Sequence, residues 1–270
     1  MNNIRPPAVA GMFYPADPQQ LEQYVRAVLA RAMREVPDLP EVHAIVAPHA
    51  GYRYSGEIAA HAFAALAEKA RRGDVRRIVL LGPAHTVPFR GIAAPAWDGF
   101  TTPLGVVPVD AQARARIAHL PQVIIDNVPH AREHALEVQL PFIQVLFPGV
   151  PVLPLVVGEA TPEEVAEVIE ALDAPDTAII ISSDLSHYEP YDQARVHDAH
   201  TAEKIAALDA HHISPLDACG ARPLSGLLEE ARKRHWKPIL LDLRNSGDTA
   251  GDKSRVVGYG AWAFIDAEAA

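Results

Sequence analysis

Short apolar runs recur along this chain, and they limit the folds available to it more than any other feature of the sequence. Each run is rich in Val, Ile, Leu and Ala without alternating polar residues, as expected for a strand that is buried on both faces. The predicted strands are 43–47, 77–82, 122–126, 150–157, 177–182, 238–243 and 256–265. Helical patterns separate several of them, at 18–35, 55–72, 134–147, 162–172, 192–210 and 216–234. This alternation predicts an α/β fold with a central, mostly parallel sheet and helices on both of its faces.

A length of 270 residues suits one large α/β domain, and the sequence offers no boundary at which to divide it. It contains no internal repeat, no low-complexity tract and no long linker, so residues 1–270 are predicted to form a single domain. A hydrophobic content of 49% supplies enough apolar side chains for a core and excludes a disordered chain. Residues 245–254 are rich in Gly, Asp and Ser and are expected to form a loop between the last two strands.

Charge and composition exclude several classes of partner and cofactor. There are 24 Lys and Arg residues against 34 Asp and Glu, and the net charge of −10 argues against a nucleic-acid partner. We expect no membrane association, because no apolar run reaches the roughly 18 residues of a spanning helix and the amino terminus lacks a signal-peptide pattern. The one cysteine, Cys219, cannot form an intrachain disulfide, so a cytoplasmic location is expected. Glycine-rich phosphate-binding motifs are absent, which disfavours a nucleotide cofactor.

Polar side chains follow three of the predicted strands at the point where each strand ends. His49 follows the first strand, His85 follows the second, and Asp184 and His187 follow the fifth. In an α/β sheet, ligands collect at the carboxyl ends of the strands. Imidazole is the commonest metal ligand in proteins, and a set of imidazoles and a carboxylate suits Fe(II), Mn or Zn. The pattern therefore predicts a metal site, although each histidine could instead cap a helix or lie exposed in a loop, and Asp184 could cap a turn.

Cys219 has two interpretations that the sequence leaves open. A lone cysteine is most often a small buried side chain. Gly220 and Pro223 interrupt the helical pattern next to it, and a thiol at a helix start has a lowered pKa. Cys219 is therefore also a candidate thiolate ligand or nucleophile.

His134 and Glu137 lie three residues apart in a predicted helix and so share one of its faces. A helical surface is the plainer interpretation, but His134 could also reach a site at the strand ends as an acid/base or as a substrate contact. Among the 13 histidines, His197 and His200 are expected on a solvated helix face.

At these residues the sequence resembles the Memo family, over almost the whole chain and in family order. The matching segments are AGMFYP (10–15), APHAGYRYSG (47–56), LGPAH (81–85), EHALEVQLPF (133–142), SSDLSHY (182–188), ACG (218–220) and GYGA (258–261). The resemblance implies a fold similar to that of the class III (LigB-like) extradiol dioxygenases, which use non-haem Fe(II). It also implies a cleft lined by two histidines and a cysteine, which correspond to His49, His85 and Cys219, with Asp184 and His187 in the third matching segment.

The resemblance further implies a biological setting. Similar bacterial and archaeal proteins are described as component B of a system with an AMMECR-type protein and a radical SAM protein. The eukaryotic relative is described as a cell-motility mediator that binds phosphotyrosine peptide, and as a metal-dependent redox protein.

Three functions fit these observations. The first is a metal-dependent oxidoreductase of the non-haem iron type, in which His49 and His85 hold a divalent metal, Cys219 or Asp184 completes the set, and His187 or His134 moves protons. Fe(II) is the expected ion, and Cu or Zn would suit a thiolate ligand. The second is a peptide-binding or scaffold protein that retains the cleft without turnover. The third is a metallohydrolase with a metal-bound hydroxide. The substrate is expected to be a small molecule or a peptide.

Overall fold

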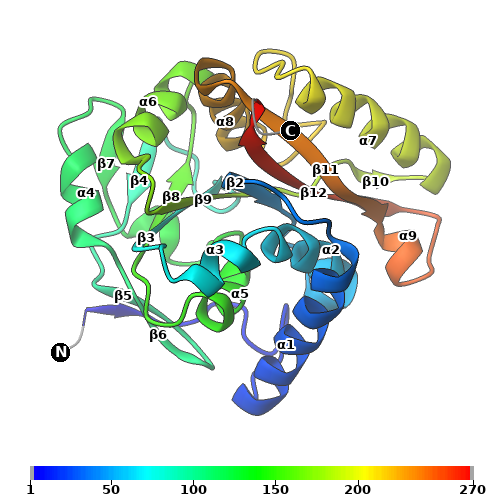
Figure 1. Cartoon of the computed structure of the whole chain (residues 1–270), viewed down its shortest axis with the longest axis horizontal. Helices are drawn as coiled ribbons and strands as arrows, with labels where there is room; N and C mark the ends of the chain where they lie inside the picture. The colour runs from blue at the N-terminus through cyan, green and yellow to red at the C-terminus, as the bar shows by residue number, and fades with distance from the viewer. Residues whose placement is uncertain (1–2, 268–270) are drawn as a thin grey trace.

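The computed structural model describes residues 3–267, and a mixed nine-stranded sheet lies at its centre (Figure 1). Its strands are β2 (Val42–Ala47), β3 (Arg77–Pro83), β4 (Ile92–Ala94), β7 (Val123–Ile125), β8 (Val152–Val157), β9 (Thr177–Ser182), β10 (His187–Glu189), β11 (Trp236–Asn245) and β12 (Val256–Asp266). Their order across the sheet is β10-β12-β2-β9-β3-β8-β4-β7, with β11 paired to β12.

The middle of this sheet is parallel. Strand β9 pairs in parallel with β2 on one side and with β3 on the other, and β3 pairs in parallel with β8. The pairings towards the edges are antiparallel, since β12 is antiparallel to β2, β10 and β11, and β4 is antiparallel to β8. The carboxyl ends of β2, β9 and β3 therefore meet at one edge of the sheet.

Helices cover both faces of the sheet, as the sequence predicted. They are α1 (Pro18–Glu35), α2 (Tyr52–Ala64), α3 (Ala67–Arg72), α4 (Ala111–Ile117), α5 (Leu140–Leu146), α6 (Pro162–Leu172), α7 (Tyr191–Ala206), α8 (Ala221–Arg234) and the short α9 (Ser246–Thr249). Successive residues of β2 point to opposite sides: Ile45 packs with the side chains of α1, α2 and α5, whereas Val46 packs with those of α4, α6 and α8. The α/β fold is confirmed.

A smaller three-stranded sheet lies beside the main one. Its strands are β1 (Ile4–Arg5), β5 (Gly99–Thr102) and β6 (Gly105–Pro108), in the order β1-β5-β6. The sequence analysis did not identify these strands, nor β4 and β10, because they are only two to four residues long. Among residues 3–267, no helix is long and apolar enough to cross a membrane.

Three predicted helices and one predicted loop differ from the structure. Residues 55–72 belong to two helices, α2 and α3, and the loop predicted at 245–254 contains the short helix α9. Within 134–147, a 3₁₀ turn (Glu137–Gln139) precedes α5, and His134 lies in the loop before that turn. Pro141 explains the break, because proline has no N–H to donate to the carbonyl four residues earlier. The helix predicted from residue 216 begins at Ala221, after its N-cap Gly220.

Candidate metal centre

The predicted strand-end residues meet because of the strand order. His49, His85 and Asp184 each lie two residues beyond the end of their strand, on β2, β3 and β9 respectively. Those three strands are adjacent and parallel, with β9 in the middle. The sheet therefore brings together side chains that lie up to 135 residues apart in the sequence.

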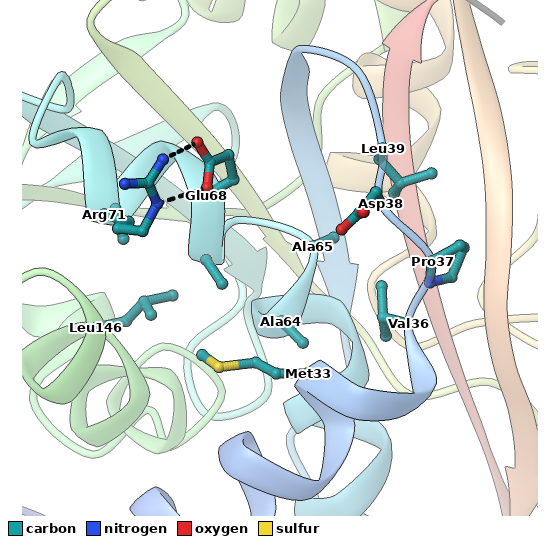
Figure 2. Close-up of a pocket in the computed structure, with 12 residues that line it drawn as sticks. Met33, Val36, Pro37, Asp38, Leu39, Ala64, Ala65, Glu68, Arg71 and Leu146 are labelled. Atoms are coloured by element: carbon teal, nitrogen blue, oxygen red, sulfur yellow. Dashed lines mark hydrogen bonds and ion pairs between the residues drawn. The ribbon is translucent and has the colours of Figure 1, made fainter.

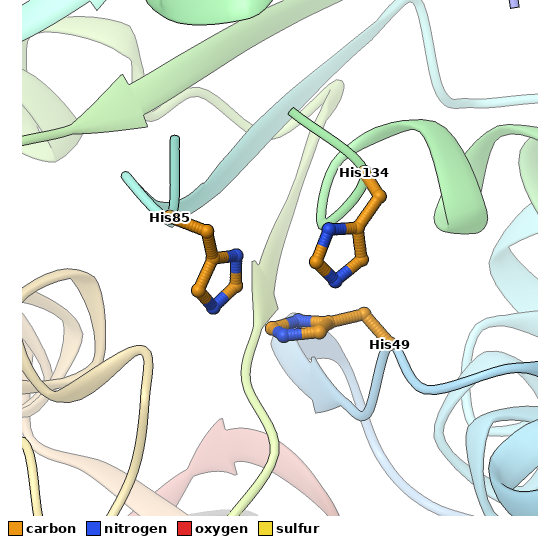
Figure 3. A group of neighbouring side chains, drawn as sticks. All are labelled: His49, His85 and His134. Carbon is orange, nitrogen blue, oxygen red and sulfur yellow. The ribbon is translucent and has the colours of Figure 1, made fainter. Parts of the chain in front are cut away.

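Three imidazoles form the centre of the site, namely those of His49, His85 and His134 (Figure 3). Each offers a ring nitrogen, and these three nitrogens all lie within 4.8 Å of one another. The rings of His85 and His134 stack with their centroids 4.8 Å apart, and the ring of His49 stands edge-on to both at 5.2 and 5.5 Å. Three ring nitrogens at this spacing could hold a metal ion.

His134 belongs to this group as fully as the two strand-end histidines. The sequence analysis assigned it to acid/base or substrate contact, and the helix on which it was placed is absent. The loop that carries it approaches β3 closely at Gly82, where a Cβ atom would lie 2.8 Å from Leu136 Cδ2. Glycine at that position therefore allows the His134 loop to lie against the end of β3.

Glu133 is the main hydrogen-bond partner of His85, and the sequence analysis gave it no role. Its side chain is 1% exposed and accepts hydrogen bonds from the backbone N–H and from Nδ1 of His85, at 2.6 and 2.8 Å. Burial by itself raises the pKa of Glu133, but the His85 contacts and the backbone N–H of Ala135 outweigh it and lower the pKa to about 2. Because the carboxylate can only accept, His85 must donate from Nδ1, which leaves Nε2 as its available ligand atom.

The charge state of His49 follows from its burial. Its side chain is 2% exposed, and burial together with the charges of His85 and His134 lowers its pKa well below 6.5. Burial likewise lowers the pKa of His134. The pKa of His85 is raised, because the effect of Glu133 outweighs the effect of burial. A neutral imidazole is the form that binds metal, so His49 and His134 are in the competent state at neutral pH.

Cys219 and Asp184 border the site on the His49 side. The Sγ atom of Cys219 lies 3.2 Å from His49 Nε2. Asp184 Oδ1 accepts from the backbone N–H of His49 at 2.7 Å, and Oδ2 lies 3.9 Å from His49 Nε2. Gly220 makes this approach possible, since a Cβ atom there would lie 2.6 Å from Ser183 Cβ.

The pKa of the Cys219 thiol is raised, whereas a position at a helix start would lower it. Cys219 precedes the N-cap of α8, and burial, assisted by the charge of Asp184, raises its pKa instead of lowering it. Burial also raises the pKa of Asp184. Without a bound cation, Cys219 is therefore a neutral thiol and not a reactive thiolate.

His187 lies on the exposed strand β10, outside the group of three imidazoles. Its charge makes a small contribution to the low pKa of His49. The next residue, Tyr188, has a positive φ of 62°, an uncommon conformation for a side chain of this size.

His197 does not lie on a solvated face as predicted. It is half-buried, with Nδ1 2.7 Å from Glu189 and Nε2 2.9 Å from Asp217. It therefore links α7 to β10 and to the loop that leads to Cys219.

The amino-terminal segment forms one wall of the site. The ring of Phe13 lies 4.7 Å from that of His134, and the Phe13 carbonyl accepts from the backbone N–H of Tyr52. Glu137, fully buried, holds this segment through an ion pair with Arg5 and through hydrogen bonds from Ala8, Val9 and Tyr14. The sequence gave no signal for these long-range contacts.

Two hollows help to locate the chemistry. One, of about 670 Å³, lies between α1, α2 and α3 (Figure 2) and is lined mainly by aliphatic side chains such as Met33, Val36 and Leu146. Of its three charged side chains, Glu68 and Arg71 pair with each other and the third is Asp38. A second hollow, of about 400 Å³, is lined by Ala84, Pro88, Phe89, Arg90, Gly158, Glu159 and Arg222. It borders the loop that carries His85.

Comparison with known proteins gives one consistent family. The sequence model of Memo-like proteins matches residues 5–263. A MEMO1 family protein of Methanopyrus kandleri is 37% identical over 96% of this chain and 98% of its own length. A MEMO1 family protein of Metallosphaera sedula is 35% identical over 97% of this chain and 99% of its own length. An uncharacterized protein of Escherichia coli K12 has a similar structure, with a TM-score of 0.52 at 14% identity over 82% of this chain and 99% of that one, which concerns the fold alone.

Proposed function

Because the chain belongs to the Memo-like protein family, as its sequence motifs predicted, we propose that it is a metal-dependent oxidoreductase centred on His49, His85 and His134. The observation that carries the proposal is the convergence of three imidazole nitrogens within 4.8 Å. The imidazole of His49 is buried and neutral. The imidazole of His85 is held at Nδ1 by the ionised carboxylate of Glu133, which is how metal-binding histidines are oriented in proteins.

The chemistry of the donors selects the type of ion. Three imidazoles with a thiol and a carboxylate at the border suit first-row transition metals and not Mg²⁺ or Ca²⁺, which prefer oxygen ligands. Fe(II) is the ion proposed, in line with the family's likeness to the extradiol dioxygenases. Such an ion would supply a redox-active centre for the oxidation of a small organic substrate or a peptide side chain.

The chain's own residues would orient the ion and exchange protons. Glu133 fixes the ring of His85, and Asp184 fixes the backbone of His49. His187 is exposed on β10, and its proposed role is to exchange protons with solvent. The hollow bordered by Ala84 and Arg222 offers space for a substrate beside His85.

Metal analysis of protein purified without chelator tests this proposal. We expect about one transition-metal ion per chain, lost in His49→Ala, His85→Ala and His134→Ala. His200→Ala is the matched control, because His200 is exposed on α7. Unchanged metal content in the three site variants would contradict the assignment.

Activity assays under air and under nitrogen then separate the three candidate functions. An oxidoreductase that uses O₂ loses activity under nitrogen, whereas a metallohydrolase retains it. A scaffold protein shows neither activity and binds peptide. The AMMECR-type and radical SAM partners stay a prediction of the family resemblance, to be tested by co-purification.

A further inference from the structure

Ser182, the last residue of β9, is fully buried between His49 and the loop that carries His134. Its Oγ atom lies 2.7 Å from the carbonyl oxygen of Ala135, 2.8 Å from Nε2 of Gln139 and 2.9 Å from Nδ1 of His49. The three contacts saturate the hydroxyl, which has one proton to donate and two lone pairs with which to accept.

The direction of each hydrogen bond can be assigned from its partner. The carbonyl of Ala135 can only accept, so Ser182 must donate its single proton to it. The amide nitrogen of Gln139 lies near the carbonyl oxygens of Ala47 and Pro48, at 3.3 and 2.9 Å, so it must be the NH₂ group and donates to Ser182. The reversed amide would place its oxygen against two carbonyl oxygens.

Only one tautomer of His49 is compatible with this arrangement. Because the proton of Ser182 is committed to Ala135, the hydroxyl can only accept from His49, and Nδ1 of His49 must carry a proton. In the neutral imidazole, which is the form that binds a metal, the Nε2 atom then keeps a lone pair. That lone pair faces Cys219 Sγ at 3.2 Å, and the neutral thiol can donate to it.

We propose that Ser182 is a positioning residue that fixes the Nδ1–H tautomer of His49 and thereby aims the bare Nε2 atom into the metal centre. Gln139 supports the hydroxyl but does not determine the tautomer, since Ser182 can accept from His49 without it. The value of this arrangement for metal binding rests on the function proposed above, whereas the tautomer itself does not.

The tautomer can be measured in metal-free protein by ¹⁵N NMR of the histidine side chains, with His49→Gln used to assign the signals. We expect wild-type His49 to carry its proton on Nδ1. In Ser182→Ala the acceptor is lost, so the Nε2–H form should appear and Co²⁺ affinity should fall about 10–100-fold. If the alanine variant does not fold, Ser182→Cys replaces it, because its thiol accepts only weakly and the Nε2–H form should again appear.

Two control variants separate this role from a general structural one. Thr177→Val removes another buried hydroxyl from the opposite end of β9 and should change neither the tautomer nor the Co²⁺ affinity. Gln139→Met should retain the Nδ1–H form. An Nε2–H tautomer in wild-type protein, or no change in Ser182→Ala, would overturn the inference. Wild-type protein with the expected tautomer but no Co²⁺ binding would contradict the proposed function and leave this inference intact.

Discussion

Replacing Glu137 with glutamine should destabilise the protein strongly, although the two side chains have the same shape and Glu137 lies outside the group of three imidazoles of the site. The carboxylate is fully buried and accepts from Arg5 Nη1 at 2.7 Å, from the Ala8 and Val9 N–H groups at 2.8 and 3.0 Å, and from the Tyr14 hydroxyl at 2.7 Å. All four partners are donors, so an amide NH₂ group cannot be placed there without facing at least one of them.

The best orientation of the new side chain can be worked out from these contacts. Its NH₂ group would take the place of Oε1, because the Tyr14 hydroxyl can rotate and accept, while the Val9 N–H loses its partner. Arg5 keeps its hydrogen bonds to the carbonyls of His130 and Glu133 but loses the carboxylate that pairs with it. Breaking one side of a buried ion pair costs about 3–5 kcal/mol.

This cost should lower the melting temperature by about 6–20 °C, at about 2–4 °C per kcal/mol for a chain of this size. Urea unfolding followed by circular dichroism measures the change in free energy. Glu22→Gln is the matched control: Glu22 pairs with Arg26 on the surface, where both side chains are about half exposed, and should cost less than about 1 kcal/mol. A Glu137→Gln variant no less stable than this control would refute the assignment of Glu137 as the residue that holds the amino-terminal wall.

Three other changes test the site itself. The pKa of Glu133 is lowered from 4.5 to about 2, so the ionised carboxylate contributes about 3 kcal/mol to the free energy of unfolding above pH 4.5, and this contribution is lost as the pH falls towards 2. The stability of the wild type, measured by urea unfolding, should therefore decline more steeply with acid than that of Glu133→Gln. An equal decline in the two proteins would contradict this expectation. Gly220→Ala, whose Cβ would lie 2.6 Å from that of Ser183, should lower the free energy of unfolding by about 1–3 kcal/mol in the same assay. Gly51→Ala is the control and should lower it less, because no atom lies nearer than 3.6 Å to its new Cβ. Because burial raises its pKa, the Cys219 thiol of metal-free protein should react with iodoacetamide far more slowly than after denaturation, and equal rates by mass spectrometry would show that it is accessible.

Local signals in the sequence account for the elements that were predicted best. Helix α1 begins at Pro18 after the capping residue Asp17, and α6 begins at Pro162 after a capping box formed by Thr161 and Glu164. Strand β9 matches its predicted bounds because a fully buried strand is apolar at successive positions. Since β2, β3 and β9 were all recognised, the positions of His49 and His85 after strand ends could be predicted as well.

Contacts between distant segments account for what the sequence could not show. The group of imidazoles includes His134 because a loop, not a helix, follows Glu133, and that loop depends on Pro141 and on the absence of a side chain at Gly82. The pattern of helical spacing gives no information on either effect. Ser182 and Gln139 lie 43 residues apart, and their hydrogen bond depends on tertiary packing alone.

The position of β9 between β2 and β3 has a consequence for the order of events during synthesis. The strands that precede His49 and His85 do not pair with each other, and residues 177–182 must be inserted between them before the two histidines have their final spacing. Parallel pairings of this sequence separation form late in folding because closing long loops costs entropy. A nascent chain can therefore assemble the centre only after β9 has left the ribosome. We therefore expect the complete centre to form after the pairing of β9 with β2 and β3, and not to act as a nucleus for folding.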